Sequence, residues 1–349
     1  MKKLSLILSV LCIGWTLSAQ PGIISTREAN DQGGKVLTME ETILSRELSP
    51  ATIHTMWDDD GTLLMYKDGK FKTYDIASGT YSDYTGKNKL SMQAVSKNGS
   101  LYVIYANGAE RLVAERENDQ ITYGEYVSRN EFGIDGGTFW APNNRKVAFY
   151  RKDESKVTSF PLLDITTRTG SLKEIKYPMA GMDSENVQLG IFDVVTGETV
   201  YAAVDDFGYD RYLTNITWSP DGEMIYIQVL DRSQKHLKLN AYSAQTGDFI
   251  KTILTEDNEK YVEPFDPLYF IKDQNFFIYR TANRDGYRNL YLCDNDGNIR
   301  RLTSVDADVK YVGNDGRYVY YTSAEVSPVE NHLFRIEIKN LKKGVAKAS

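Results

Sequence analysis

One pattern recurs along this chain and restricts what it can fold into: an aromatic or apolar strand, a tight polar turn, and a second strand of alternating polarity. Its copies are HTMWDDDGTLLMY from His54, MQAVSKNGSLYVIY from Met92, GTFWAPNNRKVAFY from Gly137, NITWSPDGEMIYIQV from Asn215, PLYFIKDQNFFIYR from Pro267 and VKYVGNDGRYVYYT from Val309. Asx-Gly and Pro-Asp-Gly between alternating runs predict hairpins, because these residues tolerate the positive φ that tight turns require.

A second hairpin follows several of these copies, as in FKTYDIASGTY from Phe71, AYSAQTGDFI from Ala241 and LYLCDNDGNIRRLT from Leu290. Paired hairpins that repeat at roughly 40 residues are typical of four-stranded propeller blades. We therefore predict an all-β fold, a β-propeller of four-stranded blades, about six to eight in number, and leave open whether the set of blades is complete. The alternative is a β-sandwich with irregular strands.

The spacing of the repeat is uneven between Ile165 and Asn215. This interval contains the turn sequence YPMAG and the hairpin VQLGIFDVVTGETVYA, from Val187 to Ala202. We expect these two features to complete one blade and to start another.

The N-terminal sequence predicts export. Lys2 and Lys3 precede an apolar run, Leu4 to Trp15, and a small-residue cleavage site ending at Ala19. These are the parts of a signal peptide, residues 1–19, and the apolar run is too short for a comfortable membrane span. No later stretch is long enough to span a bilayer, so we expect an exported, soluble protein, periplasmic or extracellular.

Residues 20–37 are Gly-rich and polar and are expected to form a flexible leader, and residues 38–349 are expected to form the propeller. A capping box, Thr38 with Glu41, predicts a short helix from about Met39 to Ser45. Removal of the signal peptide leaves Cys293 as the one remaining cysteine, so no intrachain disulfide is expected.

Composition and motifs exclude several functions. With 41 Lys+Arg, 48 Asp+Glu and a net charge of −7, the chain lacks the basic balance of a nucleic-acid surface. It has no G-x-S-x-G nucleophile elbow, no phosphate loop and no dinucleotide fingerprint. His54, His236 and His332 fall in no zinc-site pattern, so no catalytic residue, metal or cofactor is assigned. The stretches 58–61 and 294–297 look faintly like calcium loops but lack the first ligand, and we interpret them as turns.

The stretch from Val127 to Ile165 is the best candidate for a binding site. Glu131 lies in a polar loop that passes through three glycines, and a predicted hairpin from Thr138 to Tyr150 follows directly. A charged group on a loop held by strands is a common way to build a site. The simpler interpretation is a solvated loop carboxylate.

The same stretch carries a family resemblance. At Asn130-Glu131-Phe132, followed by TFWAP and FYRKDESKV, the chain resembles the dipeptidyl peptidase IV family within the prolyl oligopeptidase group. The likeness continues through FPLLDI, TRTGSLKEIKYPMAG, VQLGIFDVVTGE, NITWSPDGE, EPFDPLYFI, RTANRDGYRNLYLCDNDGNIRRLT and HLFRIEI. It covers most of the chain that follows the signal peptide.

The resemblance implies an eight-bladed propeller that caps an α/β-hydrolase domain carrying Ser, Asp and His. In this family a glutamate on a short helical propeller loop binds the free N-terminal ammonium of the peptide, and the matching position here is Glu131. Its neighbour is Asn130, where dipeptidyl members commonly have a second glutamate, so a tripeptidyl peptidase-like relative stays open. The segment from Leu63 to Tyr81 also lacks the arginine that family members often carry on an extended hairpin.

The leading hypothesis is the substrate-gating propeller of an exported dipeptidyl peptidase IV-like serine peptidase acting on proline-containing peptides. The hydrolase domain is not found in the sequence, so the chain is expected to be inactive alone, with peptide substrates or a separately encoded hydrolase domain as partners. The alternative is a standalone exported propeller that binds peptides or protein partners, and a homodimer is also open. An unrelated propeller enzyme, such as a glycosidase or lyase, would need a carboxylate or histidine cluster that the sequence does not place.

Overall fold

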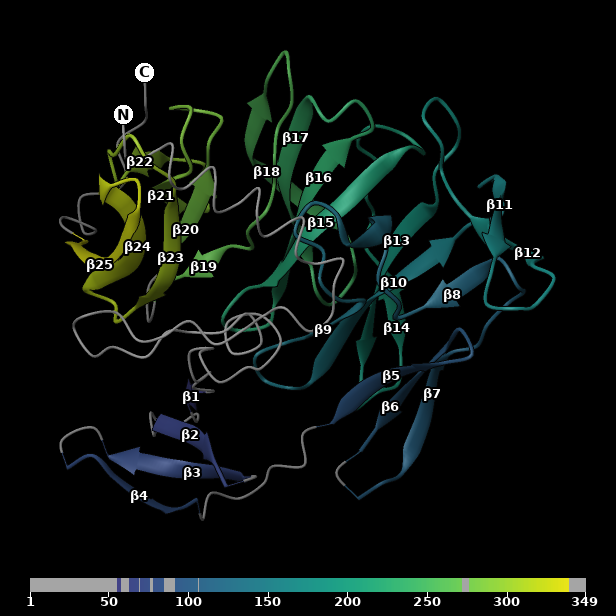
Figure 1. Cartoon of the computed structure of the whole chain (residues 1–349), viewed down its shortest axis with the longest axis horizontal. Coiled ribbons are helices and arrows are strands. Elements are labelled where there is room, and N and C mark those ends of the chain that lie inside the picture. The colour runs from purple at the N-terminus through teal and green to yellow at the C-terminus, as the bar shows by residue number, and fades with distance from the viewer. Residues whose placement is uncertain are drawn as a thin grey trace, which may run out of the picture. The chain divides into compact units, whose positions relative to one another are not determined.

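The computed structural model describes residues 55–57, 63–68, 70–75, 78–84, 92–105, 107–271 and 276–338. In this part of the chain the regular structure consists of β-strands and one short turn of 3-10 type (Figure 1). The predicted signal peptide, leader and short helix lie outside the described residues. By its contacts the chain divides into two compact units, residues 1–87 and 88–349, and each is described by itself.

The first unit contains one four-stranded antiparallel sheet in the order β1-β2-β3-β4. Its strands are β1 (Thr55–Trp57), β2 (Leu63–Lys67), β3 (Lys70–Asp75) and β4 (Thr80–Asp83). Consecutive strands pair with each other, so the two hairpins predicted for this stretch form one sheet, as expected for a blade.

The second unit begins with two sheets. The first is three-stranded and contains β5 (Gln93–Lys97), β6 (Ser100–Ile104) and β7 (Glu110–Ala114). The second contains β8 (Ile121–Tyr123), β9 (Thr138–Trp140), β10 (Lys146–Asp153), β13 (Asn186–Asp193) and β14 (Thr199–Tyr201). β8 and β9 pair with different parts of β10, and the turn η3 (Ser128–Asn130) lies on the chain between them.

Three further sheets follow in chain order. The first contains β15 (Arg211–Trp218), β16 (Met224–Asp231), β17 (His236–Ser243) and β18 (Phe249–Asp257). The next contains β19 (Tyr269–Phe270), β20 (Phe276–Thr281), β21 (Asn289–Asp294) and β22 (Ile299–Arg301). The last described sheet contains β23 (Val309–Asn314), β24 (Tyr318–Ser327) and β25 (Glu330–Glu337). The hairpins predicted in these segments are all confirmed.

The irregular interval after Ile165 differs from the expectation. Strands β13 and β14 both belong to the sheet of β10, so this hairpin completes one blade and starts no other. Between β10 and β13 the chain forms a separate two-stranded hairpin, β11 (Ser159–Asp164) and β12 (Ser171–Lys176). Most of its side chains are exposed, and it lengthens the spacing of the repeat without adding a blade.

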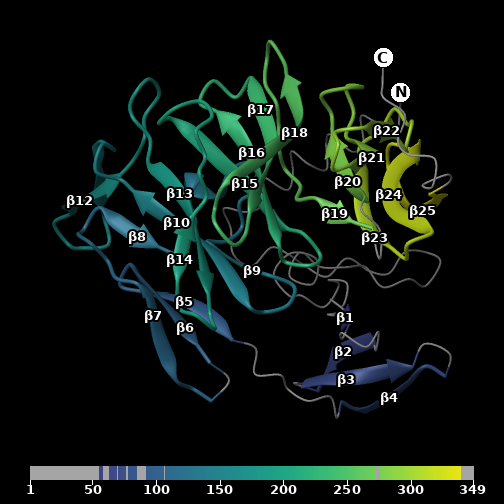
Figure 2. The ribbon, with the colours of Figure 1, turned by 180° about the vertical axis from the view of Figure 1, so that it is seen from behind.

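Neighbouring sheets of the second unit pack face to face in chain order, as seen from both sides in Figures 1 and 2. Each interface has its own apolar cluster, and every cluster combines side chains from two consecutive sheets. Antiparallel sheets that are stacked in sequence through their apolar faces are the defining feature of propeller blades. The predicted all-β propeller architecture is therefore confirmed.

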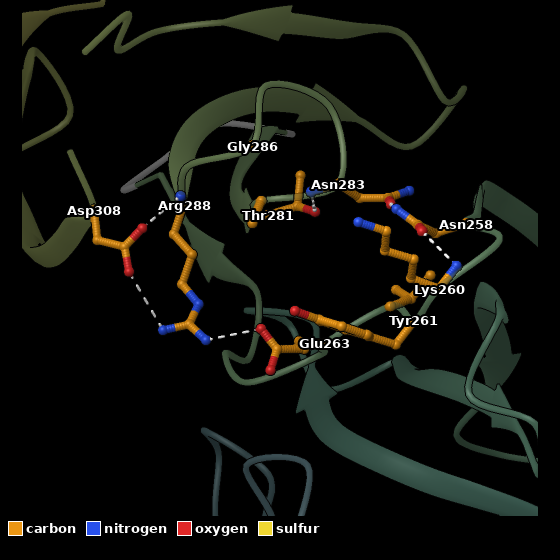
Figure 3. Close-up of a pocket in the computed structure, with 11 residues that line it drawn as sticks. Asn258, Lys260, Tyr261, Glu263, Thr281, Asn283, Gly286, Arg288 and Asp308 are labelled. Carbon is orange, nitrogen blue, oxygen red and sulfur yellow. Dashed lines mark hydrogen bonds and ion pairs between the residues drawn. The ribbon is translucent and has the colours of Figure 1, made fainter. Parts of the chain in front are cut away.

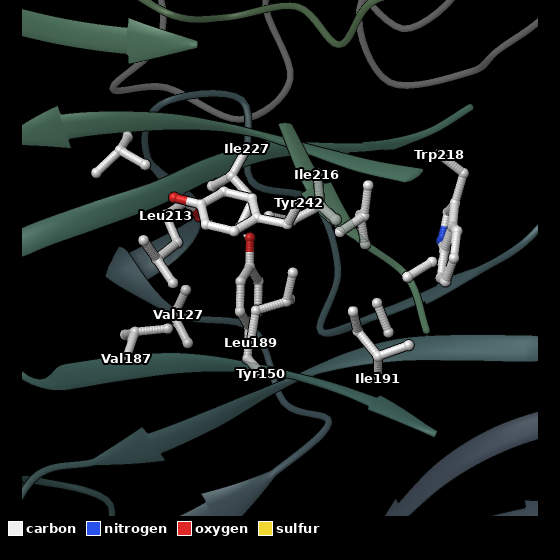
Figure 4. Packing of buried hydrophobic residues seen from close by; sticks show 14 of the residues in the cluster. Val127, Tyr150, Val187, Leu189, Ile191, Leu213, Ile216, Trp218, Ile227 and Tyr242 are labelled. Carbon is white, nitrogen blue, oxygen red and sulfur yellow. Dashed lines mark hydrogen bonds between the residues drawn. The ribbon is translucent and has the colours of Figure 1, made fainter. Parts of the chain in front are cut away.

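The largest of these clusters joins the sheet of β10 to the sheet of β15 (Figure 4). Tyr150 is 1% exposed, and its hydroxyl donates a 2.7 Å hydrogen bond to the carbonyl of Leu213 across the interface. Trp218 likewise donates from Nε1 to the Phe139 carbonyl at 3.0 Å. Buried polar atoms that bond across the interface fix how the two sheets align. These two sheets carry the candidate site.

No helix in the described ranges is long and apolar enough to cross a membrane.

Candidate functional site

Glu131 and Asn130 lie on a loop formed by residues 124–137. Both ends of this loop are hydrogen-bonded to the same residue of β10, Tyr150. The Gly124 N–H donates to the Tyr150 carbonyl at 2.8 Å, and the Tyr150 N–H donates to the Gly137 carbonyl at 3.0 Å. A Cβ atom at Gly137 would lie 2.3 Å from the carbonyl carbon and oxygen of Glu125. The two ends of the loop can approach this closely because residue 137 has no side chain.

The loop contains an unusual turn. Ser128, Arg129, Asn130 and Phe132 adopt left-handed conformations, with φ of 50°, 54°, 61° and 57°. Such values disfavour residues that have a Cβ, and a run of them persists only where surrounding contacts hold it. Within the turn, the Glu131 N–H donates to the Ser128 carbonyl at 2.9 Å and the Ile134 N–H donates to the Glu131 carbonyl at 3.0 Å.

Contacts from the connection between β12 and β13 and from strand β15 hold this turn. On one side the Ser128 N–H donates to the buried carboxylate of Glu185, and the Arg129 guanidinium lies 4.7 Å from the centre of the Tyr177 ring. On the other side the Phe132 ring packs against Tyr212, with 4.6 Å between ring centres.

A third contact comes from the amide of Asn215 on β15. It donates to the Phe132 carbonyl at 3.2 Å and also to the Pro264 carbonyl. The loop is therefore fixed between the connection that precedes β13 and strand β15.

The Glu131 side chain is exposed. No cation in the described ranges lies within ion-pair distance of its carboxylate. Burial raises the pKa of the Tyr212 hydroxyl, and the nearby negative charge of Glu131 adds to this effect. A negative charge on a fixed turn, beside a tyrosine and without an ion-pair partner in the described part of the chain, is suited to bind a cationic group.

Asn130, the neighbour of Glu131, has a contact within the loop. Its side-chain amide donates to the Ile134 carbonyl at 3.2 Å, so it closes the loop on itself. Both residues that the sequence singled out are therefore exposed on the same loop, and the side chain of Asn130 also braces its backbone.

A cavity of about 480 Å³ adjoins the loop. Phe132, the residue after Glu131, lines it. The other lining residues come from the β16–β17 and β18–β19 connections: Ser233, Gln234, Lys260, Tyr261, Val262, Glu263 and Phe265. Connections of this kind lie at one end of an antiparallel blade, because successive strands reverse direction. The site is therefore a loop cluster at one end of the blades.

A second cavity, of about 270 Å³, shares residues 260–263 with the first as lining (Figure 3). At its wall Arg288 binds Glu263 at 3.0 Å and Asp308 at 3.5 Å. The side chains of Lys260 and Tyr261 extend into it (Figure 3). Its lining is mostly polar and carries both signs of charge.

A buried carboxyl group lies close to this second cavity. Glu256 is 3% exposed and accepts a 2.9 Å hydrogen bond from the hydroxyl of Thr281, which lines the cavity. Its other oxygen lies 3.7 Å from Nε of Arg284. Burial raises the pKa of Glu256 above its usual 4.5, because the charged form is poorly solvated there.

This shift predicts a pH-dependent effect of Glu256→Gln on stability. A carboxyl whose pKa is higher in the folded state binds more protons there, so its contribution to stability falls as pH rises above about 4.5. The free energy of unfolding of the variant, relative to the parent, should therefore be higher at pH 7 than at pH 5, by about 1.4 kcal/mol per unit of pKa difference. Urea unfolding at both pH values measures it. Glu259→Gln, an exposed site on the next connection, is the control, and equal differences for both variants would contradict the expectation.

The other residues noted in the sequence that the structure describes lie in turns or on strands away from the loop. The carboxylate of Asp294 accepts the N–H groups of Asp296 and Asn298, so residues 294–297 form the predicted turn. His332 is exposed on β25 beside Glu330, 3.0 Å away. His54 and residues 58–61 lie outside the described part of the chain. Among the described residues no group of three or more His, Cys, Asp or Glu is placed to hold a metal ion.

The sequence did not indicate Glu185, Tyr177, Tyr212 or Asn215 as parts of the site. Each belongs to an ordinary strand or connection. In the sequence, each comes roughly 45 to 90 residues after the turn. No local motif links such residues. The fold alone brings them together.

The class of protein that emerges is a β-propeller with an acidic candidate binding loop at one end of its blades. A family model described as the dipeptidyl peptidase IV N-terminal region matches residues 73–347. The chain therefore belongs to this family, which confirms the resemblance seen at Asn130-Glu131-Phe132.

Comparison with individual proteins finds dipeptidyl peptidases and aminopeptidases. A candidate dipeptidyl aminopeptidase IV from Bacteroides ovatus has a crystal structure that superposes with a TM-score of 0.67, at 31% identity over 88% of this chain and 46% of that protein. Dipeptidyl peptidase 4 of Porphyromonas gingivalis has a TM-score of 0.66 at 24% identity, covering 88% of this chain and 48% of that one, and shares the fold. Probable dipeptidyl-aminopeptidase B of Pyrenophora teres f. teres is 23% identical over 91% of this chain and 40% of the relative. The chain thus spans less than half the length of these relatives.

Proposed function

We propose that the chain is the substrate-gating propeller of an exported dipeptidyl peptidase IV-like serine peptidase, and that Glu131 binds the N-terminal ammonium of a proline-containing peptide. The observation that carries the proposal is the exposed Glu131 carboxylate, which has no ion-pair partner among the described residues and is held on a fixed turn beside a cavity of about 480 Å³. Family membership supports peptides as the ligand class.

The physical basis is the pairing of charges. A protonated amine has three N–H donors and is strongly hydrated, so it enters a cavity only where a carboxylate replaces its water. A carboxylate on a rigid loop also fixes where the peptide begins. It thereby sets the distance from the N-terminus to any bond that a hydrolase domain cleaves, whether after two residues or three.

We assign recognition of the peptide and its hydrolysis to two different domains. The proposed propeller, residues 38–349, supplies recognition, and a hydrolase domain with Ser, Asp and His supplies the chemistry, because these 349 residues contain no G-x-S-x-G motif. Residues 1–19 are proposed to direct export to the periplasm or the extracellular space, and residues 20–37 to act as a leader. On this proposal the chain alone binds peptides without hydrolysing them. Release of the chromophore from a Xaa-Pro chromogenic substrate, by protein free of host peptidases, would contradict that part.

The direct test compares two ligands that differ in one charge. Isothermal titration of the chain with Ala-Pro-amide and with N-acetyl-Ala-Pro-amide should show binding of the free amine at least about tenfold tighter, because acetylation removes the ammonium. Equal affinity for both ligands would refute the role of the amine. Binding of neither would refute peptide recognition by the chain.

A second candidate, a propeller that binds a protein partner or a second copy of itself, is favoured by the hairpin β11–β12. Leu163, Ile165 and Leu172 are 65%, 79% and 73% exposed there. Exposed apolar side chains that gather on one element commonly mark an interaction surface. Sedimentation equilibrium of the chain and of a Leu163→Lys, Leu172→Lys variant tests self-association, which the variant should weaken.

A further inference from the structure

We propose that Glu185 is a positioning residue that holds the turn presenting Glu131. The inference rests on the proposed function, because the benefit of a fixed turn is the fixed place of the Glu131 carboxylate. Glu185 itself lies behind the turn and is not expected to contact the peptide.

The contact that suggests this role is direct. Oε1 of Glu185 accepts a hydrogen bond from the backbone N–H of Ser128 at 2.5 Å. Ser128 is the first of three consecutive left-handed residues, and its carbonyl in turn accepts the N–H of Glu131 at 2.9 Å. Glu185 is thus linked to Glu131 through a single residue of backbone.

The burial of Glu185 shows that this contact is unusual for a carboxylate. The residue is 8% exposed, and no Lys, Arg or His within the described ranges lies at ion-pair distance from it. A buried carboxylate without a counter-ion is unfavourable unless hydrogen bonds compensate it. Here the donor is the N–H of a backbone segment whose conformation is itself unfavourable. The charge-assisted hydrogen bond and the left-handed turn therefore stabilise each other.

A second contact from the same connection supports this interpretation. The segment between β12 and β13 also provides Tyr177, whose ring lies under the Arg129 guanidinium at 4.7 Å. Phe132, on the far side of Glu131, is held by Tyr212 and Asn215 instead. Glu131 therefore lies between two groups of contacts. Glu185 belongs to the group that holds the left-handed residues.

The experiment uses the full chain with three substitutions of residue 185. Glu185→Ala removes the acceptor, Glu185→Asp keeps the charge but shortens the side chain by one methylene, and Glu185→Gln keeps an acceptor of the same length. Glu154→Gln is the matched control, because Glu154 is a carboxyl close enough for the charge of Glu185 to act on it, yet within the described ranges its side chain pairs with Lys152 and not with the turn. Two quantities are measured: amide hydrogen exchange of residues 128–134 without ligand, and the Kd for Ala-Pro-amide.

We expect Glu185→Ala and Glu185→Asp to speed exchange in residues 128–134 about tenfold or more and to weaken the binding of Ala-Pro-amide about tenfold. Glu185→Gln should recover most of both, and the control should match the parent. A merely structural role would lower the melting temperature and leave the Kd of the folded protein and local exchange unchanged. Comparison with exchange in β16 separates local loosening of the turn from general destabilisation.

Each result decides one point. Parent-like exchange of residues 128–134 in the folded Ala and Asp variants overturns the proposal, and so does a parent-like Kd. If the parent itself does not bind Ala-Pro-amide, the proposed function fails, and the exchange measurement by itself still decides whether Glu185 holds the turn. If the Ala variant does not fold, the Asp variant decides.

Discussion

Glu131→Gln should weaken the binding of Ala-Pro-amide by about tenfold to a hundredfold, the largest effect on affinity expected for this chain. Glutamine has the same length and an oxygen acceptor, so the variant loses the charge while the loop keeps its side-chain volume. A hydrogen bond to a charged group contributes roughly 1.5–3 kcal/mol, about twice a neutral one. Isothermal titration measures the change.

Two controls make the result specific. N-acetyl-Ala-Pro-amide carries no ammonium, so its Kd should be the same for the parent and for Glu131→Gln. Asp135→Asn removes another exposed carboxylate from the same loop and should change the Kd for Ala-Pro-amide less than about threefold. An equal loss for both ligands would mean that the substitution disturbed the loop, and an equal loss for both variants would mean that only overall charge matters.

Salt provides a further check on the same contact. Because Glu131 is exposed before the peptide binds, its attraction for an ammonium is partly screened by ions. The affinity of the parent for Ala-Pro-amide should fall as salt rises, and that of Glu131→Gln should change less.

Phe149→Ala should lower the free energy of unfolding by about 3–5 kcal/mol, the largest effect on stability. Phe149 is 0% exposed in the centre of β10, in the apolar cluster that joins the sheet of β5 to the sheet of β10. Its ring lies 6.2 Å from that of Tyr123 and 6.3 Å from that of Tyr201. Truncation removes the apolar contacts and leaves a cavity that packed sheets cannot close.

The matched control is Phe160→Ala on β11, the same substitution at a residue 38% exposed, which should cost less than about 1 kcal/mol. Urea unfolding of both variants measures the difference. Similar losses for the two would show that the cluster around Phe149 is not packed as described.

Gly190, which pairs with Phe149 across the sheet, allows the opposite change, from a smaller to a larger residue. A Cβ at Gly190 would lie 2.4 Å from Cζ of Phe149, so Gly190→Ala should destabilise by about 1–3 kcal/mol through overpacking. Phe149→Leu in that background makes room for the methyl group and should recover part of the loss.

Local sequence was sufficient for the hairpins. Asn98-Gly99 and Asp221-Gly222 adopt the turn geometry their residue types favour, with φ of 82° at Gly99 and 75° at Gly222. The alternating runs on either side pair as predicted. Turn chemistry and alternation act over a few residues, so they can be read without knowing the rest of the chain.

The boundaries between blades were harder to predict from the sequence. The hairpin β13–β14 has the same local pattern whether it closes one blade or opens the next, and it closes one. The choice depends on pairing with β10 across the inserted hairpin β11–β12, which is a contact between distant parts of the sequence. Periodicity alone cannot distinguish an insertion from an additional blade.

The sequence by itself determined the strand-turn-strand repeat, the family and the position of Glu131, because each depends on short stretches of adjacent residues. Only the tertiary structure decided what surrounds Glu131. The left-handed turn is stable because Glu185 and Asn215, from a connection and a strand far along the chain, bond to its backbone. Those contacts exist only once neighbouring sheets have packed together, since packing sets which distant side chains meet.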